Sequence, residues 1–334
     1  MRFCRTDTLC GVFLSAKARK NLVFRDTGEP FARNLIGGHT MTKESVRKTQ
    51  NTSRAVKILV ESALMVAFAT VLSMLKLIEM PYGGSVTLAS AVPVLIIAYR
   101  HGTKAGLITG AVFAATQQLL GLNNLSYVTG WQSTLAVIML DYMLAFTVIG
   151  LGGIFKGKIM SPDTPAAKRQ AVEMACGMAL VSFIRYILHT VAGATVWAGL
   201  SIPTSAALLY SIGYNATYMI PETIVNVAVA AFIGGEIDFL KPVVTRIKDM
   251  AIDGGSYAPL CHILGRLAIL FPSLVITVSV LLVSPYLQDA ESGSFTFARL
   301  GEMNPTWIIV TLSLGVLLTA ACLVTKHVFA RKGK

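Results

Sequence analysis

The sequence predicts an all-α integral membrane protein whose helices cross the bilayer eight times. Hydrophobic residues make up 54% of the 334 residues and charged residues only 14%, whereas a soluble domain carries about 25% charged residues. Long apolar runs recur along the chain, and most Lys and Arg lie between these runs. The composition excludes an ordinary soluble enzyme. It also excludes a disordered chain, which needs low hydrophobicity and high charge.

The basic residues indicate membrane orientation rather than a nucleic-acid partner. A formal net charge of +12 would favour nucleic-acid binding in a soluble protein. Here the Lys and Arg sit in the loops between apolar runs, where they decide which loops stay cytoplasmic. The five cysteines form no CxxC pair and no metal-ligand spacing with His, so neither a disulfide framework nor a zinc site is expected.

The first 54 residues are predicted to be a cytoplasmic segment. Residues 1–40 hold seven Lys/Arg and three Asp/Glu and no apolar run that would cross a bilayer. Two interpretations are open for them. One is a flexible tail. The other is that they are not native protein, because residues 37–41 can be back-translated as a ribosome-binding sequence followed by a start codon. The second interpretation favours Met41 as the true start.

Eight apolar runs predict the spans. A bilayer core of about 30 Å requires roughly 20 apolar residues of helix. The predicted spans are 55–77, 85–99, 103–121, 131–155, 171–199, 204–235, 263–287 and 305–326. The second run is short and contains Pro93. With eight spans, every loop that is rich in Lys and Arg falls on one side of the membrane, so both termini are predicted to be cytoplasmic.

Small residues recur at four-residue spacing in two spans. Gly102, Gly106 and Gly110 follow one another in the third span, and Ala63 and Ala67 lie in the first. This spacing lets a second helix approach closely. Packing inside the protein and contact with a partner are both open for these residues.

Four ionisable residues lie inside predicted spans, where a charge costs on the order of 2.5–3.5 kcal/mol. Asp141 lies in the fourth span and Glu222 in the sixth, while Arg185 and His189 share one face of the fifth. With His189 neutral their charges sum to about −1, which suits a monocation. The alternative is a structural cluster in which Arg185 bridges both acids and no ligand binds.

A stripe of three residues continues from His189. Gly193 and Trp197 follow at four-residue intervals and therefore lie on the same helix face. The small Gly193 is expected to leave a gap between two flat rings. A cationic ring over Trp197 would gain about 0.5–2 kcal/mol of cation–π stabilisation.

Further aromatic and amide groups come close to this stripe. Tyr210, Tyr214, Asn215 and Tyr218 crowd the start of the sixth span. Trp131 opens the fourth span, where a ligand contact and an interfacial anchor are both open.

Motifs for catalysis are absent from the sequence. Residues 152–158 imitate a phosphate-binding loop, but Ile159 replaces the Ser or Thr that binds magnesium, and the segment ends a predicted helix. HExxH, GxSxG and a Cys/His dyad in a catalytic context are also missing. We therefore expect no enzyme and no ATPase of its own, so any pumping must draw energy from a partner or an ion gradient.

Several motifs in order resemble one known family. They are residues 83–90 (GGSVTLAS), 99–106 (YRHGTKAG), 140–146 (LDYMLAF), 185–197 (RYILHTVAGATVW) and 210–222 (YSIGYNATYMIPE). Together with Pro93 they resemble the thiamine-specific substrate-binding subunit, or S component, of energy-coupling factor transporters. The resemblance covers roughly residues 55–240.

The resemblance implies a six-helix bundle at 55–240 in a bacterial cell membrane. Residues 241–262 would be a cytoplasmic linker, and 263–334 two extra helices with a basic tail. Such a subunit captures thiamine from outside, binds no cofactor, and assembles with a transmembrane coupling subunit and two cytoplasmic ATPases.

The resemblance also implies roles for individual residues. Asp141 would be the acidic partner of the aminopyrimidine, with Arg185 and Glu222 as supporting buried charges. The other ligand-binding residues would be Tyr142, Trp131, His189, Gly193, Trp197, Tyr210 and Asn215. Ala63 and Ala67 would dock onto the coupling subunit.

Two features depart from the family pattern. The family has Glu where this chain has Asp141, and the lost methylene shortens the reach by about 1.5 Å. A pyrimidine precursor or a thiazole is therefore an alternative ligand. The other departure is the pair of extra helices, for which the sequence states no role.

Two other functions remain open. A stand-alone secondary transporter would use Asp141, Arg185 and Glu222 as a proton or ion relay, and inverted repeats would favour it. An intramembrane scaffold is the non-transport alternative.

Overall fold

A computed structural model describes residues 22–24, 30–32, 43–80, 83–199, 204–247, 257–287 and 296–332. The chain divides into two units, residues 1–59 and 60–334. The first holds a short hairpin of β1 (Leu22–Phe24) and β2 (Pro30–Ala32). Helix α1 (Lys43–Met74) begins there and continues into the second unit. Residues 37–41, which carry the prediction of a second start, lie outside the described residues.

A β-hairpin follows α1, and the sequence did not predict it. Strand β3 (Lys76–Glu79) pairs antiparallel with β4 (Ser85–Thr87), and Ile78 lies opposite Val86. The predicted span at 85–99 is therefore wrong over residues 85–91, because the helix begins only at Val92. The first span ends at Met74 rather than at residue 77. A short run of Val, Thr and Ser suits a strand as well as a helix, and periodicity alone does not separate the two.

Helix α2 (Val92–His101) is too short to cross a membrane. Its ten residues extend about 15 Å, half of the roughly 30 Å that a bilayer core needs. Pro93 stands in the first turn, where its missing N–H is no loss. Residues 92–99 of this helix are all buried, so α2 lies inside the bundle. Tyr99, Leu95 and Ile97 are among the largest fully buried side chains.

Glycines bring α3 (Thr103–Leu120) against the next span. A Cβ at Gly106 would lie 2.7 Å from the carbonyl oxygen of Gly150, and one at Gly110 would lie 2.8 Å from that of Thr147. The predicted close approach is thus confirmed for two of the three glycines, and it is internal packing. Gly102 instead joins α2 to α3 with a φ of 96°, a conformation that glycine adopts without strain.

The fourth span changes its helical geometry along its length. After the short helix η3 (Leu122–Tyr127) it begins with α4 (Trp131–Ala136). A π-helical segment η4 (Val137–Leu144), α5 (Ala145–Thr147) and a 3₁₀ segment η5 (Val148–Phe155) complete it. π-Helical turns inside α-helices are frequently found at functional sites.

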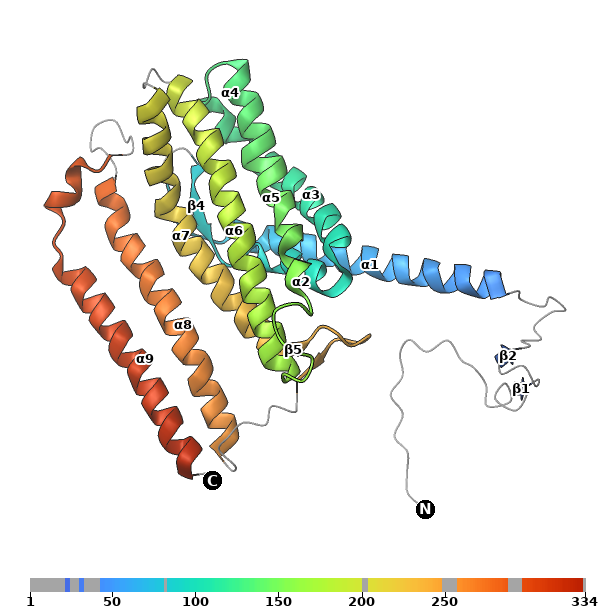
Figure 1. The fold of residues 1–334 in the computed structure, drawn as a ribbon. Coiled ribbons are helices and arrows are strands. Elements are labelled where there is room, and N and C mark those ends of the chain that lie inside the picture. Colours follow the sequence, from blue (N-terminus) through green and yellow to red (C-terminus); the bar gives the residue numbers. More distant parts are fainter. Residues whose placement is uncertain are drawn as a thin grey trace. The chain divides into compact units, whose positions relative to one another are not determined.

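Long helices form the rest of the second unit. Helices α6 (Ala166–Gly199) and α7 (Thr204–Glu236) lie side by side, and a small hairpin of β5 (Ile237–Asp238) and β6 (Thr245–Arg246) follows (Figure 1). Helix α8 (Ala258–Val283) packs beside α7, and α9 (Thr306–Lys332) packs on α8. The short helices η7 (Ser284–Leu287) and η8 (Ala298–Glu302) lie between α8 and α9 in the chain.

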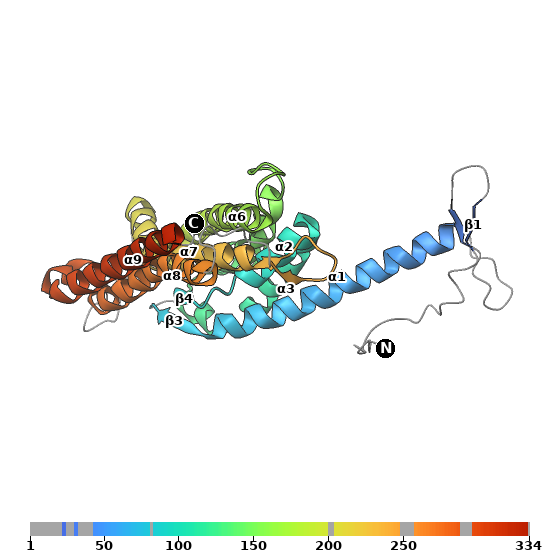
Figure 2. The same cartoon turned by 90° about the horizontal axis from the view of Figure 1, so that it is seen from below.

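Six helical segments of the described chain are long and apolar enough to cross a membrane. They are Thr52–Met74, Trp131–Phe155, Ala166–Val196, Ser205–Glu236, Ile263–Val280 and Thr306–Lys332. The predicted all-α membrane fold is confirmed, and the protein is a multi-pass membrane protein. Two of the eight predicted spans, 85–99 and 103–121, are not among these six segments. The end view shows α8 and α9 as a layer against α7 (Figure 2). The orientation of the termini stays a prediction.

Candidate functional site

A polar cavity of about 610 Å³ lies where four parts of the second unit meet. The β3–β4 hairpin and the end of α1 form one wall, and the end of α3 with η3 forms another. The π-helical segment with α5, and the facing surfaces of α6 and α7, complete the enclosure. Its volume falls in the range of small-molecule sites, about 300–1,000 Å³.

An Asp–His pair stands in this cavity. His189 Nδ1 on α6 lies 2.7 Å from Asp141 Oδ1 in the π-helical segment. An ionised Asp141 only accepts hydrogen bonds, so the proton of this bond lies on Nδ1 of His189. Nε2 of His189 is buried and has no hydrogen-bond partner among the described residues. The pair therefore places an unpartnered imidazole nitrogen beside a carboxylate.

A buried ion pair joins α6 to α7, and its arginine lies one helical turn before His189. Arg185 Nη1 on α6 lies 3.2 Å from Glu222 Oε1 on α7, and the side chains are only 4% and 5% exposed. The guanidinium also lies over the ring of Phe146, 5.0 Å from its centroid. A buried pair of this kind cannot lose one partner without leaving an uncompensated charge. The structure thus brings the four ionisable residues to one cavity as two separate pairs, so Arg185 does not bridge both acids.

A chain of hydrogen bonds orders the α7 side of the cavity. Tyr218 donates to Asn215 Oδ1 at 2.5 Å, and Asn215 Nδ2 donates to the Ser211 carbonyl at 2.8 Å. Tyr214 accepts the backbone N–H of Gly84 at 3.1 Å, which ties the β3–β4 hairpin to α7. Because both amide atoms of Asn215 are engaged, its orientation is fixed.

Gly193 has a packing role that the sequence did not reveal. It lines the cavity, as predicted. A Cβ at this position would lie 2.4 Å from Ser211 Oγ and 3.3 Å from Asn215 Nδ2. The glycine thus lets α6 and α7 approach closely, and much of the gap expected beside it is occupied by Ser211.

The aromatic residues predicted for the site do not all line the cavity. Tyr142 lines the cavity, and its hydroxyl accepts from Asn124 Nδ2 at 2.9 Å. Among the described residues that line the cavity, neither Trp131 nor Tyr210 is found. Trp131 is 73% exposed, which agrees with an interfacial anchor. Trp197 lies in the described backbone of α6, but its side chain is outside the described residues.

Two parts of the cavity wall were not predicted from the sequence. They are the β3–β4 hairpin and a set of amide side chains. Gln117 on α3 and Asn124 in η3 line the cavity, and Gln117 Nε2 donates to Ser73 Oγ on α1 at 2.8 Å. Lys76 and Glu79 of the hairpin pair with each other at the wall. The available signal was two pairs of amide residues, Gln117 with Gln118 and Asn123 with Asn124, at the end of an apolar segment.

The charges of the cavity leave one negative unit. The carboxylates of Asp141, Glu222 and Glu79 outnumber the cations of Arg185 and Lys76 by one. The arrangement therefore complements one positive charge. In the part of the chain that the structure describes, no three His, Cys, Asp or Glu side chains gather to hold a metal ion.

The two-helix C-terminal region touches the outside of this site. Leu287, at the end of η7, is buried in a cluster with Tyr214 and Tyr218. Leu300 in η8 and Tyr210 pack against the same cluster. The connection between α8 and α9 thus supports the tyrosines whose inner edges face the cavity.

Small residues of α1 face outward. Ala63 and Ala67 are both exposed, as are Leu64 and Phe68 beside them. Within the second unit this leaves an apolar helix face with small residues at its centre.

Comparison with known proteins places the chain in a family. The sequence profile described as thiamine transporter protein (Thia_YuaJ) matches residues 59–239. The thiamine transporter ThiT of Bacillus subtilis is 32% identical over 178 residues, 52% of this chain and 88% of the relative. ThiT of Lacticaseibacillus paracasei is 24% identical over 180 residues, 52% of this chain and 84% of the relative.

A solved structure of ThiT from Listeria monocytogenes is 24% identical with a TM-score of 0.45, and it covers 54% of this chain and 94% of that one. The profile starts within α1 and ends just after β5, so α8 and α9 lie beyond it. It spans more than half of the 334 residues. The predicted resemblance is confirmed, and the chain belongs to the thiamine transporter protein family.

Proposed function

We propose that the protein binds thiamine from outside the cell and serves as the S component of an energy-coupling factor importer. The observation that carries the proposal is the polar cavity, in which the carboxylates outnumber the Lys and Arg side chains by one. Thiamine has one fixed positive charge and two flat rings. The names of the relatives from two other bacteria point to the same ligand.

The proposed ligand contacts follow from the polar atoms that remain available. Asp141 is 29% exposed at its side chain, so the carboxylate can accept from an amino group of the pyrimidine while it holds His189. Nε2 of His189 is a second polar atom without a partner among the described residues, and it is proposed to bond to the ligand. Tyr142, Gly193 and Asn215 line the remaining space.

The other predicted aromatic residues receive separate roles. Trp197 is proposed to stack on a ring, because it continues the α6 stripe of His189 and Gly193. Tyr210 is proposed to support the tyrosine wall from outside, as its packing suggests. Trp131 is proposed to anchor the fourth span at the membrane surface, since its side chain is largely exposed.

The energy for transport is proposed to come from partner proteins. The α1 face with Ala63 and Ala67 is exposed and apolar, which suits docking of a transmembrane coupling subunit. Two cytoplasmic ATPases would complete the importer. The loops rich in Lys and Arg support cytoplasmic termini in a bacterial plasma membrane.

Binding measured without ATP tests this function. The purified protein is titrated calorimetrically with thiamine, its phosphates, and its pyrimidine and thiazole halves. We expect saturable binding of thiamine at micromolar or lower concentration and weaker binding of each half. Tighter binding of one half would reassign the ligand, and no binding of any of them would refute the proposal.

A reconstitution experiment separates an importer subunit from a stand-alone transporter. Liposomes that contain only this protein are supplied with thiamine and a proton gradient. We expect no accumulation, because the energy source is a partner. Gradient-driven accumulation would instead assign the Asp141, Arg185 and Glu222 cluster to an ion relay.

A further inference from the structure

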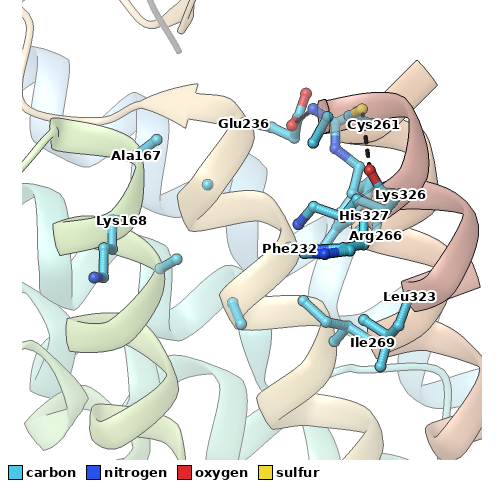
Figure 3. A pocket seen from close by; sticks show the side chains of 15 residues that line it. Ala167, Lys168, Phe232, Glu236, Cys261, Arg266, Ile269, Leu323, Lys326 and His327 are labelled. Carbon is cyan, nitrogen blue, oxygen red and sulfur yellow. Dashed lines mark hydrogen bonds and ion pairs between the residues drawn. The ribbon is translucent and has the colours of Figure 1, made fainter. Parts of the chain in front are cut away.

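A second cavity, of about 650 Å³, lies far along the helices from Asp141 and His189. It is formed where the first turns of α6, the last turns of α7, the first turns of α8 and the last turns of α9 meet. Figure 3 shows Lys168 of α6 on one side and Arg266, Lys326 and His327 of α8 and α9 on the other. The matched family profile ends at residue 239, so two of the four walls belong to the extension.

The charge of this cavity is positive. Lys168, Arg266 and Lys326 line it, and Glu236 is the acidic residue among the described lining side chains. Arg266 pairs with Glu236, and Arg246 from β6 lies 3.4 Å from the same carboxylate. Glu236 is therefore already balanced. A surplus of about two positive charges faces the cavity.

Packing holds these cations in place. A Cβ at Gly265 would lie 2.9 Å from Lys326 Nζ, so the glycine leaves room for that side chain to cross α8. Cys261 contacts the Lys326 carbonyl at 3.6 Å, which fixes α9 beside α8 (Figure 3). The guanidinium of Arg266 lies over the ring of Phe232, 5.4 Å from its centroid.

The walls become apolar toward the middle of the helices. Ile269 lies further into α8 than Arg266, and Leu323 lies further into α9 than Lys326. Figure 3 shows these two side chains together on one side of the cations. A cavity with cations at the helix ends and aliphatic walls behind them matches a molecule with an anionic head and an apolar tail.

We propose that this cavity binds an anionic phospholipid. The phosphate of the headgroup contacts Lys168, Arg266 and Lys326, and an acyl chain lies along Ile269 and Leu323. Basic pockets between membrane helices on the cytoplasmic side bind anionic headgroups by this chemistry. The loops at this end of the helices are the basic ones, which places the cavity on the predicted cytoplasmic side. The two extra helices thereby give this chain a lipid site that the 59–239 region alone does not form.

Thermal unfolding of the full chain in detergent tests the proposal. Dioleoylphosphatidylglycerol, dioleoylphosphatidylcholine and inorganic phosphate are added separately. A ligand that binds only the folded state raises the midpoint, so we expect phosphatidylglycerol to raise it by about 2–4 °C more than phosphatidylcholine. Equal shifts with both lipids would overturn the proposal. An equal shift with phosphate alone would show an anion site rather than a lipid site, and would overturn it as well.

Matched variants locate the effect. Lys168→Gln with Lys326→Gln removes two cavity charges, whereas Lys104→Gln with Lys158→Gln removes two exposed charges elsewhere. The first pair is expected to lose most of the phosphatidylglycerol-specific shift, and the second pair to keep it. Equal loss in both pairs would mean that only net charge matters.

A variant that fills the cavity removes space but no charge. Ala231→Phe places a ring among the lining side chains. Native mass spectrometry should count one tightly bound phosphatidylglycerol fewer than in the unchanged protein. A retained lipid in a folded Ala231→Phe protein would contradict the assigned position.

Discussion

The region that matches the family profile, residues 59–239, differs from the extension formed by α8 and α9 in the share of its side chains that are buried. In the apolar windows of α6 and α7, 39% and 44% of the residues are buried, but in those of α8 and α9 only 11% are. The matched region encloses a core around α2 and a polar cavity, whereas α8 and α9 form a layer on one flank. Because few of their residues are buried, α8 and α9 contribute to the protein mainly through the two ends of the helix pair. One end supports the tyrosine wall, and the other builds the cationic cavity.

The largest expected effect concerns the outward face of α1. Replacing Ala63 and Ala67 with Trp places bulk on an exposed surface. We expect thiamine uptake in cells to fall to background, because close helix approach to the coupling subunit is blocked, while thiamine binding by the purified protein stays within about twofold. Val316→Trp, on the exposed surface of α9, is the control and should retain uptake. A joint loss of uptake and binding would instead place α1 in the protein's own core.

A smaller effect is expected from the acid in the π-helical segment. Asp141→Asn removes the charge that the ligand cation balances and leaves His189 without an anionic partner. Thiamine affinity should fall on the order of 10- to 100-fold, which is about 1.4–2.8 kcal/mol. Calorimetry measures it, with Asp163→Asn in an exposed turn as the control. An unchanged Kd would show that Asp141 only positions the helices.

A smaller effect still is expected when the contact between the α8–α9 connection and the tyrosines of the site is removed. Leu287→Ala removes a buried side chain that packs in the cluster of Tyr214 and Tyr218. We expect thiamine to dissociate about two- to tenfold faster, since the tyrosine wall loses one neighbour. Stopped-flow displacement measures the rate. Val280→Ala is a second test in the same cluster, and an unchanged rate in both variants would separate the extension from the site.

The smallest effect on thiamine is expected from the contact between the extra helices. Gly315 of α9 packs on α8, and a Cβ there would lie 2.3 Å from Val275 Cγ2. Gly315→Val should push the helices apart and weaken phosphatidylglycerol-dependent stabilisation, yet leave thiamine affinity within about twofold. A large loss of affinity would show that the two regions form one cooperative unit rather than a site and its flank.

The sequence predicted the charged part of the site because charge is costly in a membrane. Asp141, Arg185, His189 and Glu222 had to face the interior, and helical spacing placed two of them on one face. The small residues at 106 and 110 also predicted a close helix crossing, which the structure contains.

Other features depended on contacts between distant segments. The β3–β4 hairpin cannot be recognised from its local sequence, because a contact with a distant helix holds it in place. Tyr214 on α7 accepts a hydrogen bond from the Gly84 N–H. The π-helical turn around Asp141 leaves no pattern in the local sequence. The pocket at Lys168 and Lys326 joins residues more than a hundred positions apart, so the sequence showed only scattered basic residues.

The central claim is that a single unbalanced negative charge in the cavity selects a flat cation. Calorimetry with thiamine and with a neutral analogue, in which carbon replaces the charged ring nitrogen, tests it most directly. We predict that the unchanged protein binds thiamine at least about tenfold tighter, or about 1.4 kcal/mol, and that Asp141→Asn abolishes this preference. Equal affinity of the unchanged protein for both molecules would contradict the account.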